Sequence, residues 1–151
     1  MEALGRLPAG VERFQVMVGT PPDEFNENTY VVYDEATRDA LIIDPGARDP
    51  RIETFIRTPG LKVKKILNTH GHSPGSVCYL INGHLFSGDV LFKNGVGRTW
   101  GQNKAEEKEK MAQQTSHIKT RLLVLPTAAR VFPGHGPDTT IGREKENNFL
   151  L

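Results

Sequence analysis

Residues 66–76 read Ile-Leu-Asn-Thr-His-Gly-His-Ser-Pro-Gly-Ser, and this stretch decides how the rest of the chain is interpreted. The preceding residues, from 63 to 67, favour a strand, so His70 and His72 follow directly on its expected end. Alternate side chains of an extended backbone point the same way, which places both imidazoles on one side. Two neutral imidazoles within reach of one cation are a common zinc arrangement. The pair therefore predicts a metal site at the end of this strand.

Two further candidate ligands stand at expected strand ends elsewhere in the chain. Asp89 follows Gly88 after an apolar run, and its carboxylate would stand among the loops beyond that strand. His135 lies between Gly134 and Gly136, where the backbone can approach closely and leave the ring free to turn inward. Four residues could thus share one cation, namely His70, His72, Asp89 and His135. Four protein ligands would close a tetrahedral zinc site, whereas three would leave one position open to water.

The elements around these positions alternate between strands and helices. Strands are expected at 14–18, 28–34, 41–43, 63–67, 77–81, 84–87 and 131–132, and helices at 49–57, 105–125 and 144–148. Asn82-Gly83 is the strongest short hairpin signal in the chain. The helix expected at 105–125 has a polar first half, so we expect that half to be solvated or to contact a partner. This pattern predicts a layered α/β domain.

Composition excludes several classes of protein. The 151 residues fit one domain, and 19 Lys+Arg against 18 Asp+Glu give a net charge of +1, which offers no support for a nucleic-acid or membrane-surface partner. No apolar run approaches the roughly 20 residues of a membrane helix. Residues 1–14 lack the apolar stretch of a signal peptide, and the one cysteine, Cys78, allows no internal disulfide. We therefore expect a cytoplasmic protein.

The remaining histidines and the cysteine are expected to have ordinary structural roles. His84 follows the hairpin turn and His117 lies inside the long helix, so each is interpreted as a surface or packing residue. Cys78 alternates with apolar neighbours in an expected strand, which indicates a core thiol.

Six stretches, in order along the chain, carry a family resemblance: 27–32 (ENTYVV), 41–46 (LIIDPG), 66–72 (ILNTHGH), 71–76 (GHSPGS), 85–92 (LFSGDVLF) and 132–137 (FPGHGP). In these stretches the chain resembles the metallo-β-lactamase-fold superfamily, specifically its hydroxyacylglutathione hydrolase (glyoxalase II)-like branch. The resemblance implies an α/β (α+β) fold, a shortened αββα sandwich of two mixed sheets with helices outside. It implies one truncated domain over 1–151, with the metal site on loops at one edge.

The resemblance also implies roles for individual residues. Members of the family bind two metals through five histidines and two aspartates, one of which bridges. Asp89 matches the bridging aspartate, His135 matches a late histidine of the second metal, and His70 matches the first histidine of the T-H-x-H motif. Asp44 is the nearest family-matched carboxylate left to act near the attacking water, so it joins Asp89 as a candidate catalytic residue. Arg98 is a candidate substrate-binding residue.

The sequence departs from the family pattern at the first metal motif. Family members continue T-H-x-H with x-D-H, and a separate histidine precedes the P-G-S segment several dozen residues later. Here Thr69 to His72 runs straight into Ser73-Pro74-Gly75, so the intervening segment is missing and the two motifs are fused. His72 can be the second histidine of the first motif or the later lone histidine. At most four of seven ligands remain, so at most one zinc per chain is expected, with iron or manganese as other metals that such ligands take. Gly97-Arg98 is followed by Thr99-Trp100 where the family tends to continue Thr-Asp, and we expect no C-terminal helical domain of the kind that binds glutathione in some members.

Two functions follow from these observations. The first is a metal-dependent hydrolase of an acyl thioester, acting through a metal-bound hydroxide with activity reduced by the missing ligands. The alternative is a catalytically inactive, shortened fold that acts as a structural or oligomeric binding module. Loss of a helix and a strand from one layer would expose apolar surface, so we expect a homodimer, which could exchange elements between its chains.

Overall fold

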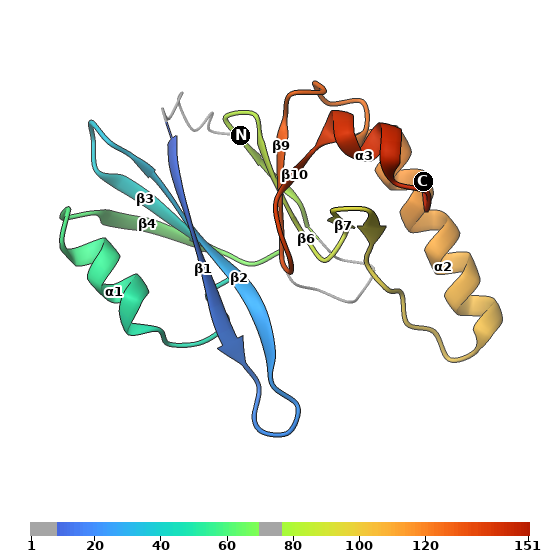
Figure 1. The fold of residues 1–151 in the computed structure, drawn as a ribbon, viewed down its shortest axis with the longest axis horizontal. Coiled ribbons are helices and arrows are strands. Elements are labelled where there is room, and N and C mark those ends of the chain that lie inside the picture. The colour runs from blue at the N-terminus through green and yellow to red at the C-terminus, as the bar shows by residue number, and fades with distance from the viewer. Residues whose placement is uncertain (1–8, 70–76) are drawn as a thin grey trace. The chain divides into compact units, whose positions relative to one another are not determined.

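The computed structural model describes residues 9–69 and 77–151 (Figure 1). The chain divides into two compact units, Met1–Asn68 and Thr69–Leu151. Each unit contains one four-stranded sheet and an apolar core of its own. The expectation of a single domain over 1–151 stays a prediction.

The first unit is built on a mixed sheet of strand order β1-β2-β3-β4. Its elements are β1 (Ala9–Val18), β2 (Phe25–Asp34), β3 (Asp39–Ile43), α1 (Pro50–Arg57) and β4 (Lys62–Leu67). The first three strands are antiparallel neighbours, and β3 pairs in parallel with β4 through the crossover that contains α1. All the expected strands of this unit are confirmed. β1 is longer than its apolar run because it pairs with β2 along its whole length.

Helix α1 begins where its sequence directs. The Asp49 carboxylate accepts a hydrogen bond from the Arg51 backbone N–H at 2.8 Å. Pro50 occupies the first helical position, where a backbone N–H would have no acceptor within the helix, so the proline costs no helical hydrogen bond. Figure 1 shows α1 beside this sheet, and Ile52 is buried in the core of the unit. The helix expected at 49–57 is therefore confirmed, and it is amphipathic.

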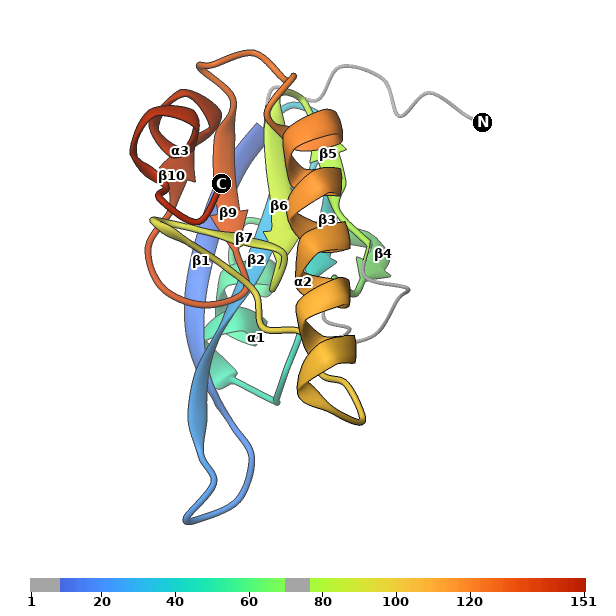
Figure 2. The same ribbon diagram turned by 90° about the vertical axis from the view of Figure 1, so that its right-hand side faces the viewer.

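The second unit contains a mixed sheet of order β10-β9-β6-β5 and a short two-stranded hairpin (Figure 2). Its strands are β5 (Tyr79–Ile81), β6 (His84–Gly88), β7 (Leu91–Phe92), β8 (Gly95–Val96), β9 (Arg130–Pro133) and β10 (Thr139–Thr140). Strands β6 and β9 are parallel, and the other pairs of this sheet are antiparallel. The hairpin at Asn82-Gly83 is confirmed, since both residues adopt the positive φ (50° and 77°) of the tight turn that such a pair favours.

The helices of this unit pack on its sheet through one apolar cluster. They are α2 (Lys104–His117), its π-helical continuation η1 (Ile118–Leu122) and α3 (Ile141–Asn147). The cluster joins Leu85 and Val131 of the sheet to Ile118 and Ile141 of the helices. No residue of α2 is buried, as its polar sequence predicts, and the apolar anchor comes only at Ile118. None of the helices described is long and apolar enough to cross a membrane.

Candidate metal site

Two of the candidate ligands lie together in the second unit. Asp89 and His135 follow parallel strands β6 and β9, and the His135 Nε2 lies 3.4 Å from the Asp89 Oδ2. The Asp89 side chain is 11% exposed and the His135 side chain is 32% exposed, so the pair can still be reached from solvent. The two side chains are thus neighbours, while their expected role as metal ligands stays a prediction.

Backbone pairing between the strand ends creates this proximity. The Gly134 amide donates to the Gly88 carbonyl at 2.9 Å, one residue before each candidate ligand. Parallel strands place their carboxyl ends at the same edge of a sheet, so the two residues that follow emerge side by side. Strand pairing thus brings Asp89 and His135 together although they lie far apart in the sequence.

The β7–β8 hairpin packs against the backbone of Asp89. The Ser87 hydroxyl donates to the Leu91 carbonyl at 2.7 Å, and the Gly97 amide donates to the Val90 carbonyl at 3.2 Å. A Cβ placed on Gly97 would lie 1.6 Å from the Asp89 carbonyl oxygen. Only a glycine at 97 permits this return of the hairpin against Asp89.

Thr69, the residue before the His70–His72 motif, lies against Gly88, the residue before Asp89. Gly88 has φ +50°, and a Cβ at this position would lie 2.4 Å from the Thr69 Oγ1. Thr69 is buried and is the last described residue before the motif. His70 and His72 lie outside the described residues. Their expected role as ligands stays a prediction, and its support is the position of Thr69.

The described donor pair fits a zinc ion. Zinc ligands at about 2.0–2.2 Å in tetrahedral geometry lie about 3.3–3.6 Å from one another. The 3.4 Å between Nε2 and Oδ2 matches this separation and exceeds the N–O distance of a good hydrogen bond. Residues 9–69 and 77–151 contain no cluster of three or more His, Cys, Asp or Glu that would complete a site by itself. The described residues thus supply two candidate ligands, and a complete zinc site would need at least one more.

Asp44 belongs to the first unit, at the end of β3. It is buried and has φ 52°, and its carbonyl accepts the Thr29 hydroxyl at 2.6 Å and the Gly46 amide at 2.9 Å. Its amide donates to the Leu67 carbonyl at 2.9 Å, which ties the ends of β3 and β4. These contacts establish a structural role for the Asp44 backbone, while a catalytic role for its carboxylate stays a prediction.

Arg98 and the residues after it form a loop attached to α2. The Gln114 amide donates to the Gly97 carbonyl at 2.9 Å, and the Lys110 ammonium donates to the Trp100 carbonyl at 3.0 Å. Arg98 and Trp100 are both exposed, Trp100 by 59%. A substrate contact from Arg98 stays a prediction that its exposure permits.

The structural roles of the other histidines are confirmed. The His84 ring packs edge-on against Phe132 at a centroid distance of 5.4 Å, and burial together with the nearby Arg130 lowers the pKa of His84. His117 is the exposed last residue of α2.

Cys78 is a packed thiol. It contacts the apolar cluster of the second unit, and its thiol donates to the Ser87 carbonyl at 3.7 Å. Burial raises the pKa of Cys78 to about 11, which opposes a nucleophilic role.

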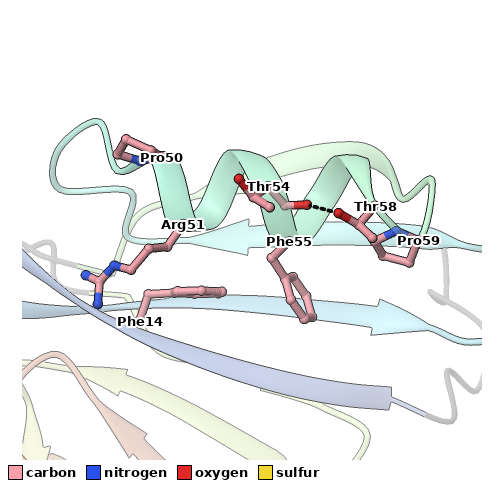
Figure 3. Close-up of a pocket in the computed structure, with 7 residues that line it drawn as sticks. All are labelled: Phe14, Pro50, Arg51, Thr54, Phe55, Thr58 and Pro59. Atoms are coloured by element: carbon pink, nitrogen blue, oxygen red, sulfur yellow. Dashed lines mark hydrogen bonds between the residues drawn. The ribbon is translucent and has the colours of Figure 1, made fainter.

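The first unit has a separate surface groove of about 670 Å³ between β1 and α1 (Figure 3). Its walls are formed by Phe14, Pro50, Arg51, Thr54, Phe55, Thr58 and Pro59. The Arg51 guanidinium is paired with Asp49 and donates to the Gln15 carbonyl at 2.6 Å, so it is not available to the groove. The lining is mainly apolar and contains no side chain suited to binding a metal.

Phe92, Gly97 and Glu144 were not singled out from the sequence. Phe92 and Gly97 contact His135 and Asp89, and Glu144 binds the β7–β8 turn. Phe92 lies against the His135 ring at a centroid distance of 6.3 Å, and Glu144 is a fully buried carboxylate. Gly97 follows a strand of only two residues, which has no period to detect, so its close approach to Asp89 left no local signal. The contacts of Glu144 span some 50 residues, so no local pattern could reveal them.

Known proteins resemble this chain in sequence over part of its length. A family model described as the metallo-beta-lactamase superfamily matches residues 22–74. The probable metallo-hydrolase YqgX of Bacillus subtilis (strain 168) is 42% identical over 91 residues, covering 56% of this chain and 39% of that protein. The hydroxyacylglutathione hydrolase GloC of Haemophilus influenzae is 38% identical over 89 residues, covering 58% and 40%. The matched part of the chain thus spans about two fifths of the length of these curated relatives.

Solved structures share the fold over almost the whole chain. The BLEG-1 B3 metallo-beta-lactamase aligns with a TM-score of 0.75 at 24% identity, covering 93% of this chain and 99% of that chain. The protein TTHA1623, in a di-iron-bound form, aligns with a TM-score of 0.69 at 27% identity, covering 91% and 100%. The predicted fold class is therefore confirmed, with two mixed sheets and their helices. Family model, metallo-hydrolase relatives and shared fold agree, so the chain is similar to the metallo-beta-lactamase superfamily in sequence over part of its length and in fold over most of it.

Proposed function

We propose that this chain is a metal-dependent hydrolase that cleaves an acyl thioester of the hydroxyacylglutathione type. The observation that carries the proposal is the 3.4 Å approach of the His135 Nε2 to the Asp89 Oδ2 at the carboxyl ends of two parallel strands. One curated relative is named as a hydroxyacylglutathione hydrolase, and another, from Bacillus velezensis, as a probable zinc-dependent hydrolase. These names support the choice of a thioester substrate and of zinc as the first metal to test.

In this proposal three of the four residues Asp89, His135, His70 and His72 would hold the metal during catalysis, which leaves the fourth position open to water. A bound zinc ion supplies Lewis acidity, which activates water near neutral pH and polarises the substrate carbonyl. The net reaction adds water to the acyl carbon and breaks the carbon–sulfur bond, and the departing sulfur takes a proton. Arg98 contacts the substrate from the loop after β8, and Asp44, in the first unit, stays the other candidate catalytic carboxylate. Iron and manganese are the other metals that this donor set takes.

Metal content and turnover test the proposal together. Protein stripped with a chelator and restored with zinc should hold about one zinc per chain, measured by mass spectrometry, and should hydrolyse S-lactoylglutathione only after restoration. Asp89→Asn should lose zinc and activity. Asp138→Asn is the matched control, because Asp138 is an aspartate of the same unit whose carboxylate pairs with Arg130 on the surface. Wild-type protein that neither binds zinc nor cleaves the thioester would overturn the proposal and favour the inactive binding module.

We also propose that the chain forms a homodimer in the cytoplasm. The support is the outer strand β4, where Val63 and Ile66 are 39% and 59% exposed, and strand β5, where Leu80 is 53% exposed. A second copy that covers these apolar side chains would remove them from water. Light scattering after gel filtration should give twice the mass of one chain, and Ile66→Asp should lower it. A single-chain mass for the wild type would contradict the dimer.

A further inference from the structure

Side chains from the C-terminal segment converge on the turn between β7 and β8. The Glu144 Oε2 accepts the Asn94 backbone N–H at 2.7 Å, and the Arg143 Nη1 donates to the Asn94 Oδ1 at 2.6 Å. The Asn148 Nδ2 donates to the Gly95 carbonyl at 3.1 Å. Asn94 has φ 61°, a conformation that non-glycine residues adopt rarely and that these bonds hold in place. The turn is therefore fixed by residues about 50 positions away in the sequence.

Glu144 is the centre of this arrangement. It is fully buried, and its Oε1 accepts the Thr139 hydroxyl at 2.6 Å and the Arg143 Nη1 at 3.2 Å. Its Oε2 accepts the Asn148 Nδ2 at 3.0 Å in addition to the Asn94 amide. A buried carboxylate is costly unless its oxygens receive hydrogen bonds, so the hairpin turn must stay where its amide can donate. With both oxygens engaged by these donors, Glu144 is bound to its neighbours and is not placed to bind a metal itself.

The hairpin that Glu144 holds reaches the candidate ligands at two points. The Phe92 ring, on β7, lies 6.3 Å from the His135 ring between centroids, at an interplanar angle of 43°. At the other end of the hairpin, Gly97 lies against the Asp89 carbonyl. Figure 2 shows β7 beside β9 in the same unit as α3. A shift of the turn would thus be transmitted to both His135 and Asp89.

We propose that Glu144 is a positioning residue for the metal site, acting through the β7–β8 turn and Phe92 on the His135 imidazole. This inference rests on the proposed function for its consequence, which is the metal affinity. Groups that orient metal ligands without touching the metal typically change affinity by about 10- to 100-fold when replaced.

Zinc affinity provides the first test. Glu144→Gln keeps the shape of the side chain but replaces one acceptor oxygen with an amide that donates, so one pair of donors loses its acceptor. Competition with a chromogenic chelator should show zinc binding weakened by about tenfold or more. Glu146→Gln makes the same chemical change on an exposed residue of α3 and should leave the affinity unchanged. Equal affinities in the three proteins, with the wild type binding zinc, would overturn the inference while the proposed function survives.

Coupling between Glu144 and Phe92 separates positioning from simple stability. Phe92→Leu should weaken zinc binding while it leaves the hydrogen bonds of Glu144 intact. If Glu144 acts through Phe92, the double variant should lose much less affinity than the product of the single losses. Independent losses would contradict the route through Phe92. Should Glu144→Gln fail to fold, Asn148→Ala takes its place in the double-variant comparison with Phe92→Leu. Asn148→Ala removes the hydrogen bond from Asn148 to the Gly95 carbonyl of the turn.

A measurement on metal-free protein makes the inference independent of the hydrolase proposal. The His135 ring resonances in a ¹H–¹³C spectrum report the position of Phe92, whose ring lies against the imidazole. They should shift in Glu144→Gln and coincide with the wild type in Glu146→Gln. Unmoved His135 resonances in Glu144→Gln would refute positioning. A shift in a protein that binds no zinc would uphold positioning and refute the hydrolase.

Discussion

Gly97 and Asp89 approach each other so closely that a Cβ on Gly97 would lie 1.6 Å from the Asp89 carbonyl oxygen. The contact arises because the β7–β8 hairpin leaves the sheet at Asp89 and returns at Gly97, whose amide donates to Val90. The Gln114 amide of α2 donates to the Gly97 carbonyl at 2.9 Å. The end of the hairpin that contacts the backbone of a candidate ligand is thus bound to a helix.

Gly97→Ala should therefore displace Asp89 and destabilise the second unit. The added methyl group meets backbone, which cannot turn aside as a flexible side chain does, so we expect the melting temperature to fall and zinc affinity to drop by at least tenfold. Gly95→Ala is the matched control on the same hairpin, because a Cβ there meets only the Phe92 Cβ at an ordinary 3.8 Å. Similar melting curves for the two variants would show that the contact at Gly97 is relaxed in solution.

Ile118 should be a principal anchor of α2. It is fully buried in the cluster of the second unit, whereas no residue from Lys104 to His117 is buried. Ile118→Ala should lower the free energy of unfolding by about 2–5 kcal/mol, from lost burial and the cavity left behind. Val124→Ala, at a side chain that is 70% exposed, should change it by less than about 0.5 kcal/mol. Urea denaturation measures both, and equal effects would contradict the packing of η1.

His84 should make the protein less stable in mild acid. Burial, reinforced by the positive charge of Arg130, lowers the pKa of His84 below its ordinary value of 6.5. The unfolded chain then binds the proton more tightly, so this contribution is fully present above pH 6.5 and is lost as the pH falls through the folded-state pKa. His84→Gln should flatten the decline in melting temperature below pH 6.5. His117→Gln, at an exposed position, should follow the wild-type profile.

Cys78 should react slowly with thiol reagents in the folded protein. Burial raises its pKa from 9.0 to about 11, which lowers the thiolate fraction at pH 8 by roughly 100-fold before access is considered. Iodoacetamide labelling followed by mass spectrometry should be at least that much faster in urea than in buffer. Rapid labelling of folded protein would contradict the packed environment of this thiol.

The local elements of both units could be predicted from the sequence because each depends on near neighbours. Asp49-Pro50 begins α1, Asn82-Gly83 turns the hairpin between β5 and β6, and runs of β-branched residues form the strands. The short strands β7, β8 and β10 were missed, since two residues contain no period to detect. The helix expected at 105–125 ends in a π-helical turn at Leu122, where packing of Ile118 outweighs local propensity.

The family resemblance, the strand-end positions of Asp89 and His135, and the residue types that suit a metal can all be read from the sequence alone. The 3.4 Å distance between these two side chains, the contacts of Phe92 and Gly97 with them, and the bond of Glu144 to the β7–β8 turn follow only from the tertiary structure. A motif consists of residues that are close in the sequence, so it can be recognised in a single chain. Contacts between residues some 40 to 50 positions apart depend on how strands pair and where a hairpin returns, and no periodicity encodes that partner choice.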